Sequence, residues 1–527
     1  MELCDKYLHE IIKVDPTIND FFLKEEYLSK RHIQPNIYSD DYLDRLNKID
    51  NKYLKILEKK DDLTIYDKIL LKDIKENIHF EENYEVFTHM PVTTNNILVF
   101  YVTEANGSGN FKFKVKKDYD NFIGRLKSLD TITDTIIQKM KKGIQKKVTL
   151  YLGTIDQMID ILENILKNQL FYHKKKGPHQ KRFNKMIEKY LENNLQRFFN
   201  FLVNEYYSHG SKKMGLHSYK EGKKLYRNMI KHSLLEGLTP ESINKFGYTE
   251  LKKLIKEKKK LETKLNIKDI NKYFKENKSF YYNNKEDIIK DLKDIRDDLY
   301  QTIYPVNFHE DPKKSEYYDV KSSPEELKNY TAYYISPDLE HTRKGTFYIN
   351  TNNPSQISKH ELYVLSLHEG IPGHHYEILF HLKENKPDYF KTSGYTSYSE
   401  GWALYSEHLG DYKDINNYYY KLEYDIHRTI RLIIDTSIHY FGWEYDKCFQ
   451  FMKKYLSFSD DYIHRELLRY INLPGQALTY KIGEKVILYL RKLSFDQGIS
   501  TKDFHKKVME IGPCPLDVLI EQFNANL

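Results

Sequence analysis

Apolar side chains recur every three or four residues through most of the chain, which is the period of an amphipathic α-helix. The stretch 41–49 shows this spacing clearly, and the stretches 161–170 and 182–203 carry similar apolar stripes. Patterns of this kind extend over residues 1–90 and about 117–300, and they predominate again toward the end of the chain. The sequence therefore predicts a mainly α-helical fold.

A few short runs have the composition of strands instead. Residues 96–102 are rich in β-branched and aromatic side chains, and residues 111–115 alternate between apolar and basic positions after a glycine-containing turn signal. This order predicts a small β-hairpin near 96–115. The runs 330–335 and 345–350 predict two further strands, so we expect a small β element beside the helices.

The stretch 304–324 is polar and irregular, and it is the expected connection between two regions. We therefore divide the chain into a helical N-terminal region, 1–303, and a metal-binding catalytic region, 304–527, which together form one integrated unit. If the strand at 345–350 lies at an open sheet edge, it could hold an extended peptide by backbone pairing. An ordinary sheet strand is an equally good interpretation.

The composition excludes several classes of protein. The net charge of +7 is small against 83 basic and 76 acidic residues, and no basic run carries a nucleic-acid motif, so we expect a mixed-charge surface and no nucleic-acid partner. The three cysteines are far apart and predict a reducing compartment. There is no signal-peptide pattern and no apolar run long enough to span a membrane, so the expected protein is soluble and cytoplasmic, with no membrane partner.

The chemistry of the chain concentrates in the segment H-E-G-I-P-G-H-H at 368–375. In the common zinc motif, two histidines four residues apart share a helix face, and a glutamate after the first acts as general base. Here the residue four positions after His368 is Pro372, so the motif is not matched strictly. On a straight helix, His374 would point to a different side from His368, and His375 would lie about 10 Å further along the axis. Neither could therefore share an ion with His368.

The dipeptide Pro372-Gly373 could change the course of the helix so that a second histidine reaches the ion. Proline kinks a helix and glycine tolerates the resulting backbone, so a two-residue bulge would bring His374 to the place of the usual second ligand. We therefore favour His374 over His375 as the ligand. His375 would then lie behind the ligands or face the substrate.

A third ligand is expected from another helix, and Glu400 lies at a suitable distance along the chain to return to the site. Glu407, two turns further on the same face, is suited to hold a ligand histidine in place. His408 is a weaker candidate ligand. Burying so many imidazoles and carboxylates on apolar helices would be costly without a metal ion or other partners.

These motifs also carry a family resemblance. Together with E-G-W-A-L-Y at 400–405, the histidine motif resembles a large, mainly bacterial family that is placed among the gluzincin-like zinc metallopeptidases. Three further stretches agree with that family, and the resemblance is clear from about residue 330 to 520. The three stretches are 345–351, the pair of segments 469–470 and 474–483, and 504–519.

The resemblance implies a large helical metallopeptidase fold with Zn²⁺ at the base of a deep cleft. It implies His368, His374 and Glu400 as zinc ligands and Glu369 as the general base. The expected substrates are peptides or oligopeptides, cleaved by metal-activated water. A zinc hydrolase of a non-peptide amide or ester would use the same ligands, and a catalytically inactive binding protein could keep the same cleft. The intact Glu369 argues against the inactive protein.

The oxyanion formed in peptide hydrolysis needs a hydrogen-bond donor besides the metal. Tyr480 and Arg469, from the segment that carries Pro474-Gly475-Gln476, are the candidate catalytic residues for this task. Arg469 could equally anchor the terminal carboxylate of a peptide through a bidentate pair. A packed core tyrosine is an equally good interpretation of Tyr480, because the chain contains 46 tyrosines.

Overall fold

The chain divides into two compact units in this computed structural model. Unit 1 comprises Met1–Lys220 with Pro387–Tyr389, and unit 2 comprises Glu221–Lys386 with Phe390–Leu527. The structure describes residues 2–22, 24–83, 85–94, 96–109, 111–173, 179–310, 312–323, 332–337, 344–392 and 394–525.

The boundary between the units lies well before residue 303, where the sequence placed it. Helices α13 (Pro240–Leu265) and α15 (Lys285–Thr302) account for the difference. In unit 2, α13 packs along α21 (Ile415–Thr436), and α15 contacts α17 (Glu361–Leu365). These helices therefore belong with the predicted catalytic region, because their apolar faces are buried against it.

Unit 1 is built from helices. Its α-helices are α1 (Leu3–Val14), α2 (Asn19–Phe22), α3 (Asp40–Leu57), α4 (Ile65–Asn83), α5 (Glu85–His89), α6 (Ile97–Ala105), α7 (Lys116–Leu126), α8 (Leu129–Lys146), α9 (Leu152–Lys167), α10 (Gln180–Met186) and α11 (Asn193–Phe201). The short helix α19 (Asp388–Thr392) begins in unit 1 and ends in unit 2.

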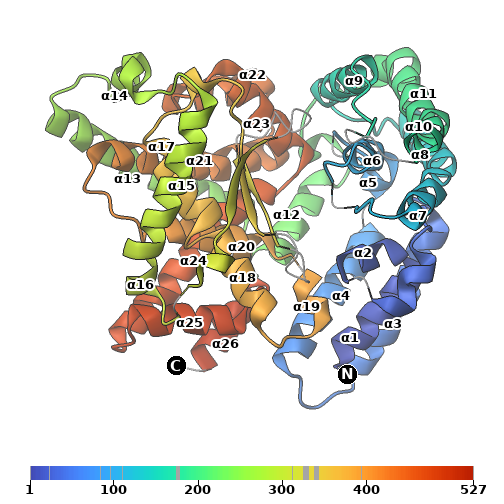
Figure 1. Ribbon diagram of the computed structural model, residues 1–527, viewed down its shortest axis with the longest axis horizontal. Helices are drawn as coiled ribbons and strands as arrows, with labels where there is room; N and C mark the ends of the chain where they lie inside the picture. Colours follow the sequence, from blue (N-terminus) through green and yellow to red (C-terminus); the bar gives the residue numbers. More distant parts are fainter. Residues whose placement is uncertain are drawn as a thin grey trace. The chain divides into compact units, whose positions relative to one another are not determined.

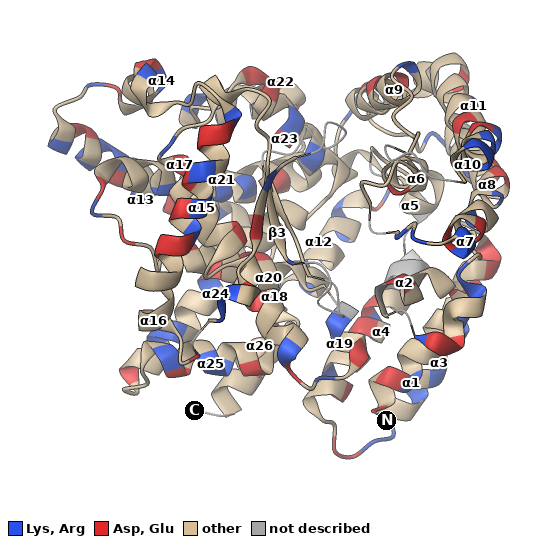
Figure 2. Ribbon diagram, viewed as in Figure 1, with Lys and Arg blue, Asp and Glu red and all other residues tan. Residues whose placement is uncertain are grey.

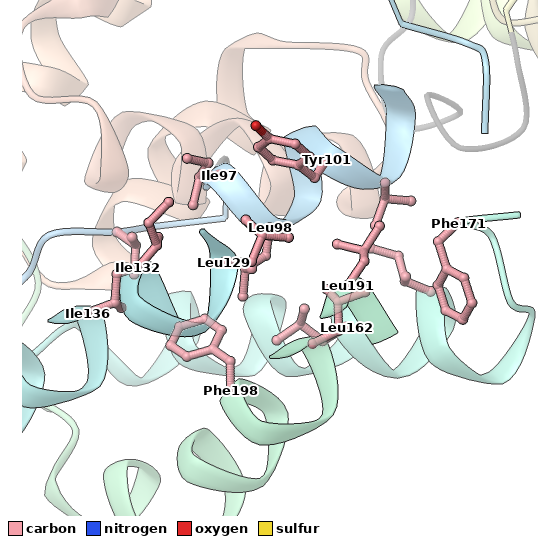
Figure 3. Packing of buried hydrophobic residues seen from close by; sticks show 14 of the residues in the cluster. Ile97, Leu98, Tyr101, Leu129, Ile132, Ile136, Leu162, Phe171, Leu191 and Phe198 are labelled. Carbon is pink, nitrogen blue, oxygen red and sulfur yellow. The ribbon is translucent and has the colours of Figure 1, made fainter. Parts of the chain in front are cut away.

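The prediction of a hairpin near 96–115 is wrong, because the residues expected to form its first strand form helix α6. The Asn96 side chain caps this helix by accepting hydrogen bonds from Leu98 N at 3.0 Å and Val99 N at 3.2 Å. Ile97, Leu98 and Tyr101 are buried among side chains of α8 and α9 (Figure 3). The described residues of 111–115 form no strand. The packing of this buried face thus outweighed the strand propensity of the run, although Phe100 on the same helix is 54% exposed.

Unit 2 combines helices with one small sheet (Figure 1). Besides α13, α15, α17 and α21, its α-helices are α12 (Gly222–Ser233), α14 (Ile270–Glu276), α16 (Tyr304–Asn307), α18 (His374–Lys383), α20 (Thr396–Glu407), α22 (Tyr445–Tyr455), α23 (Asp460–Asn472), α24 (Gln476–Asp496), α25 (Thr501–Ile511) and α26 (Leu516–Ala525). A mainly α fold with a small β element is thereby confirmed.

The sheet has the strand order β1-β3-β2. Strand β1 (Asp319–Ser322) runs parallel to β3 (Thr346–Ile349), and β2 (Ala332–Ile335) runs antiparallel to β3. The strands predicted at 330–335 and 345–350 are confirmed as β2 and β3, although 330 and 331 lie outside the described residues. Strand β1 was not predicted, because it lies in the polar stretch that was assigned to a connection.

Two glycines let α20 and α24 approach each other closely. A Cβ atom on Gly401 would lie 2.6 Å from Gly483 Cα, and one on Gly483 would lie 2.0 Å from Ser397 O. Neither position could hold a larger residue without moving backbone. This contact brings the residue before Gly401, Glu400, close to the helix that carries Tyr480.

The surface of the helices is mixed in charge. Figure 2 shows acidic and basic residues interspersed along α15, where Lys290 and Asp294 form an ion pair at 2.6 Å. Among the described helices, none is both long enough and apolar enough to cross a membrane.

Candidate metal centre

The histidine motif spans a break between two helices of unit 2. The π-helical turn η11 (Ser366–Gly370) ends before Ile371, and α18 begins at His374. A Cβ atom on Gly373 would lie 1.8 Å from the carbonyl oxygen of His368, so only glycine fits at this crossing. The sequence predicted a bulge within one helix, whereas the structure has a full break between η11 and α18.

This break brings the three predicted metal ligands together. His368 Nε2 lies 3.4 Å and His374 Nε2 lies 3.6 Å from Glu400 Oε2, and the three ligand atoms all lie within 4.8 Å of one another. Two ligand atoms at about 2.1 Å from one tetrahedral zinc would be about 3.4 Å apart. The observed spacing therefore suits a single shared ion.

The electrostatics of the cluster favour a positive charge. Burial by itself lowers the pKa of His368, but Glu400 and Glu407 outweigh burial and raise that pKa to about 9. Burial raises the pKa of Glu400, yet His368 and His374 hold it well below its usual range. Glu400 Oε2 is buried and has no hydrogen-bond partner among the described residues. A cation bound here would satisfy this oxygen.

Glu407 holds His368 from behind. Its Oε1 atom lies 2.9 Å from His368 Nδ1, which leaves Nε2 to face Glu400. The Glu407 side chain is fully buried, and Lys421 Nζ and Arg428 Nη2 each approach its carboxylate to 3.6 Å. Arg428 and Lys421 lower the pKa of Glu407 against the effect of burial. The carboxylate is thus kept ionised, as a partner for a ligand histidine should be.

Helix α20 is tied directly to the break in the motif. Trp402 Nε1 donates a hydrogen bond to Pro372 O at 2.9 Å, and Ser406 Oγ donates to the same oxygen at 3.2 Å. These bonds satisfy a buried carbonyl that the interrupted helix leaves without a helical partner. They also fix the position of Glu400, which lies half a turn from Trp402, relative to the two histidines.

His375 points away from the cluster. Its Nδ1 atom lies 2.7 Å from the hydroxyl oxygen of Tyr334 on β2, and the ring also packs against Tyr318. Burial lowers the pKa of His375 to about 3, so this ring is neutral at ordinary pH. The geometry places His374, and not His375, beside His368 and Glu400.

Glu369 adjoins the cluster at the exposed side. It follows His368 on η11 and is partly exposed. Burial lowers the pKa of His368, and the charge of Glu369 raises it together with Glu400 and Glu407, whose effects are larger. Its carboxylate is therefore close to the ligands and accessible to water.

Tyr480 and Arg469 lie together, from α24 and α23. Arg469 Nη2 donates to the Tyr480 hydroxyl at 2.9 Å. Burial and then the charge of Glu400 raise the pKa of Tyr480. The contact of Gly483, one turn from Tyr480, with Gly401, next to Glu400, turns this side of α24 toward the candidate centre. Arg469 also contacts Glu466 Oε1 at 3.2 Å and Gln476 Oε1 at 2.9 Å.

His408 does not join this cluster. Its Nε2 atom lies 2.6 Å from Glu484 Oε1, and with Asp425 the two residues form another group of possible ligand atoms. Lys481 Nζ, however, lies 2.7 Å from Glu484 Oε2 and 3.2 Å from Asp425 Oδ1. Lys421 pairs with Asp425 at 2.9 Å. The lysines already neutralise these carboxylates, so we interpret this group as a buried ion-pair network.

The sequence reasoning missed the charged residues on α21 that surround the site. Arg428 and Arg431 are almost fully buried on α21, among apolar residues such as Ile430 and other buried charged residues such as Asp425. Buried charges of this kind are rare unless they are paired. Their spacing of three residues within an apolar pattern was a signal that could have identified them.

Comparisons with known proteins place the chain in a family and a fold. The profile of a family described as "Bacterial protein of unknown function (DUF885)" matches residues 28–523. No curated protein is similar to the chain in sequence.

Two solved structures share its fold. A crystal structure of a "putative lipoprotein" from Colwellia psychrerythraea is 21% identical, with a TM-score of 0.86 over 99% of this chain and 98% of that chain. A structure of a "putative lipoprotein of unknown function" from Shewanella oneidensis is 13% identical, with a TM-score of 0.76 over 98% of both chains.

Proposed function

The chain belongs to the DUF885 family of bacterial proteins, and from the His–Glu cluster of unit 2 we propose that it is a zinc-dependent peptidase. The observation that carries this proposal is the spacing of His368 Nε2 and His374 Nε2 from Glu400 Oε2, at 3.4 and 3.6 Å. Two neutral imidazoles and one carboxylate, with room for water, are a ligand set of catalytic zinc.

The residues of the cluster fit this ion. His368, His374 and Glu400 would hold it, and Glu407 would keep His368 oriented through Nδ1. A zinc ion bound there would act as a Lewis acid and lower the pKa of a coordinated water toward neutrality. The buried Glu400 oxygen without a hydrogen-bond partner supports a cation at this point.

The remaining chemistry falls to residues of this chain. Glu369, next to a ligand and partly exposed, would take a proton from the attacking water and pass it to the leaving amine. Tyr480 would donate its hydroxyl hydrogen to the oxyanion that develops on the scissile carbonyl. The hydroxyl is held by Arg469, at 2.9 Å, so the donor is positioned before substrate binds.

Strand β2 supports peptides as the substrate class. It lies at an edge of the sheet and beside η11, which carries His368 and Glu369. Its four described residues are only partly buried. An extended peptide could pair with this edge strand and present a peptide bond to the cluster.

The cytoplasmic location predicted from the sequence belongs to this proposal as well. The two similar structures are called putative lipoproteins, and that name would fit attachment to a membrane by lipid. Fractionating cells that express the full-length gene would decide between these locations. Recovery of the protein with the membrane fraction would refute the cytoplasmic prediction.

Metal content and peptide hydrolysis together test the proposal. We expect about one zinc per chain by elemental analysis of the wild-type protein, loss of that zinc in His374→Ala, and retention in the control His375→Ala. Glu369→Gln should keep the zinc and lose cleavage of a peptide library.

Three outcomes would point elsewhere. Zinc that stays in His374→Ala but leaves in His375→Ala would overturn the ligand assignment. Hydrolysis of esters or small amides, without peptide cleavage, would identify a different zinc hydrolase. A zinc-loaded wild-type protein without any hydrolytic activity would indicate a binding protein.

A further inference from the structure

The Tyr480 hydroxyl is surrounded by hydrogen-bond donors. Arg469 Nη2 lies 2.9 Å and Gln476 Nε2 lies 3.5 Å from its oxygen. A guanidinium group has no acceptor, so the Arg469 contact uses the Tyr480 oxygen as acceptor. The one acceptor of the Gln476 side chain, Oε1, receives its own hydrogen bond from Arg469 at 2.9 Å.

The hydroxyl hydrogen must therefore point in a third direction. Within the described part of the chain, no group accepts it. Gly483, one turn from Tyr480 on α24, packs against Gly401, the residue after Glu400 on α20, so Tyr480 lies on the side of α24 that faces the His–Glu cluster. In agreement, the charge of Glu400 is the largest cause after burial that raises the pKa of Tyr480. The ring is held from its face by Arg431, whose guanidinium carbon lies 4.4 Å from the ring centroid.

The donors are themselves fixed by a buried carboxylate. Glu466 accepts from Arg469 Nη1 at 3.2 Å, from Arg431 Nη2 at 3.0 Å and from the Tyr470 hydroxyl at 2.6 Å. Arg431 Nε also contacts the Tyr470 hydroxyl at 3.1 Å. This network joins α21, α23 and α24, so neither arginine can turn without breaking charge-assisted hydrogen bonds.

We propose that Arg469 and Gln476 are positioning residues that direct the Tyr480 hydroxyl hydrogen into the candidate centre. This inference rests on the proposed function and explains how the proposed oxyanion donor, Tyr480, is oriented. Both terminal nitrogens of Arg469 already donate within the protein, one to Glu466 and one to Gln476 and Tyr480. Arg469 therefore presents no free bidentate face to a substrate carboxylate, which was the other prediction for this residue.

A double-mutant cycle tests the inference on the library peptide that the wild-type protein cleaves fastest. We expect Tyr480→Phe to lower kcat about 100-fold with little change in KM, as loss of one oxyanion donor does. Arg469→Gln should lower kcat about 10-fold in the wild-type background and leave it unchanged when Tyr480→Phe is already present. Tyr489→Phe, at a half-exposed position on the same helix, is the control and should leave kcat unchanged.

An equal loss from Arg469→Gln in both backgrounds would overturn the inference, because Arg469 would then act independently of Tyr480. So would a rise in KM with an unchanged kcat, which is expected of a residue that binds substrate. Gln476→Leu removes the second donor and repeats the test if the Arg469 variant fails to fold, which circular dichroism would reveal.

A second readout does not depend on activity. With 3-fluorotyrosine introduced at position 480, ¹⁹F NMR reports the ionisation of this phenol alone. Arg469 stabilises the phenolate, so Arg469→Gln should raise the observed pKa, whereas Lys506→Gln on another helix should not. An unchanged pKa in Arg469→Gln would refute the contact. A raised pKa in a protein without peptidase activity would support the contact and refute the proposed function.

Discussion

Replacing Gly401 by alanine sets two effects of opposite sign against each other. Alanine is the better helix former by about 1 kcal/mol, so on helix propensity alone the substitution would stabilise α20. The added Cβ, however, would lie 2.5 Å from Gly483 C, 2.6 Å from Gly483 Cα and 3.0 Å from Glu484 N. These are backbone atoms of α24, which cannot rotate away as a side chain would.

We therefore expect the steric effect to win. Overpacking a close contact typically costs about 1–3 kcal/mol, and a contact against backbone belongs at the upper end. The net destabilisation is then about 2 kcal/mol, which corresponds to a fall in Tm of about 2–3 °C for a protein of this size. Because the two helices must separate, Glu400 and Tyr480 should also move apart, and zinc affinity and kcat should fall.

Differential scanning calorimetry of zinc-free protein measures the effect on stability directly. Gly394→Ala is the matched control, since nothing lies within 4 Å of a Cβ at that position. It should change Tm by less than about 1 °C, because surface substitutions usually change stability by less than about 0.5 kcal/mol. A Tm for Gly401→Ala equal to or above that of the wild-type protein would refute the close packing of α20 on α24.

Two further predictions concern buried carboxylates. Glu407→Gln keeps an acceptor for His368 but loses the charge, so zinc affinity measured by competition with a chelator should fall about 10–100-fold; an unchanged affinity would contradict the role of Glu407. Burial raises the pKa of Asp435 to about 7, so its contribution to stability is full at low pH and is lost as pH rises through about 7. As pH rises from 5.5 to 8, the Tm of Asp435→Asn, which keeps an acceptor for Gly475 N, should therefore fall less than the Tm of the wild-type protein. An equal fall in both proteins would show that Asp435 does not titrate in this range.

The local sequence determined the helical character of the chain and the strands β2 and β3. Amphipathic spacing recurs along most helices, because each buries one face and exposes the other. The same reasoning failed at α6, because the continuous apolar run 97–102 includes the exposed Phe100 and so hides the helical spacing of the buried residues. There the contacts with α8 and α9 decided the secondary structure, and the sequence of the run alone favoured a strand.

For the candidate centre, the sequence supplied the ligand types and a distortion of the helix at Pro372-Gly373, because those depend on local chemistry and backbone geometry; that the distortion is a full break only the structure showed. Only the tertiary structure decided which imidazole turns inward, since that depends on Tyr334 holding His375 and on Trp402 tying α20 to Pro372 O. The surrounding network of Arg431, Glu466 and Arg469 likewise depends on residues from different helices. Such residues are brought together by packing, which leaves little periodic signal in any one segment.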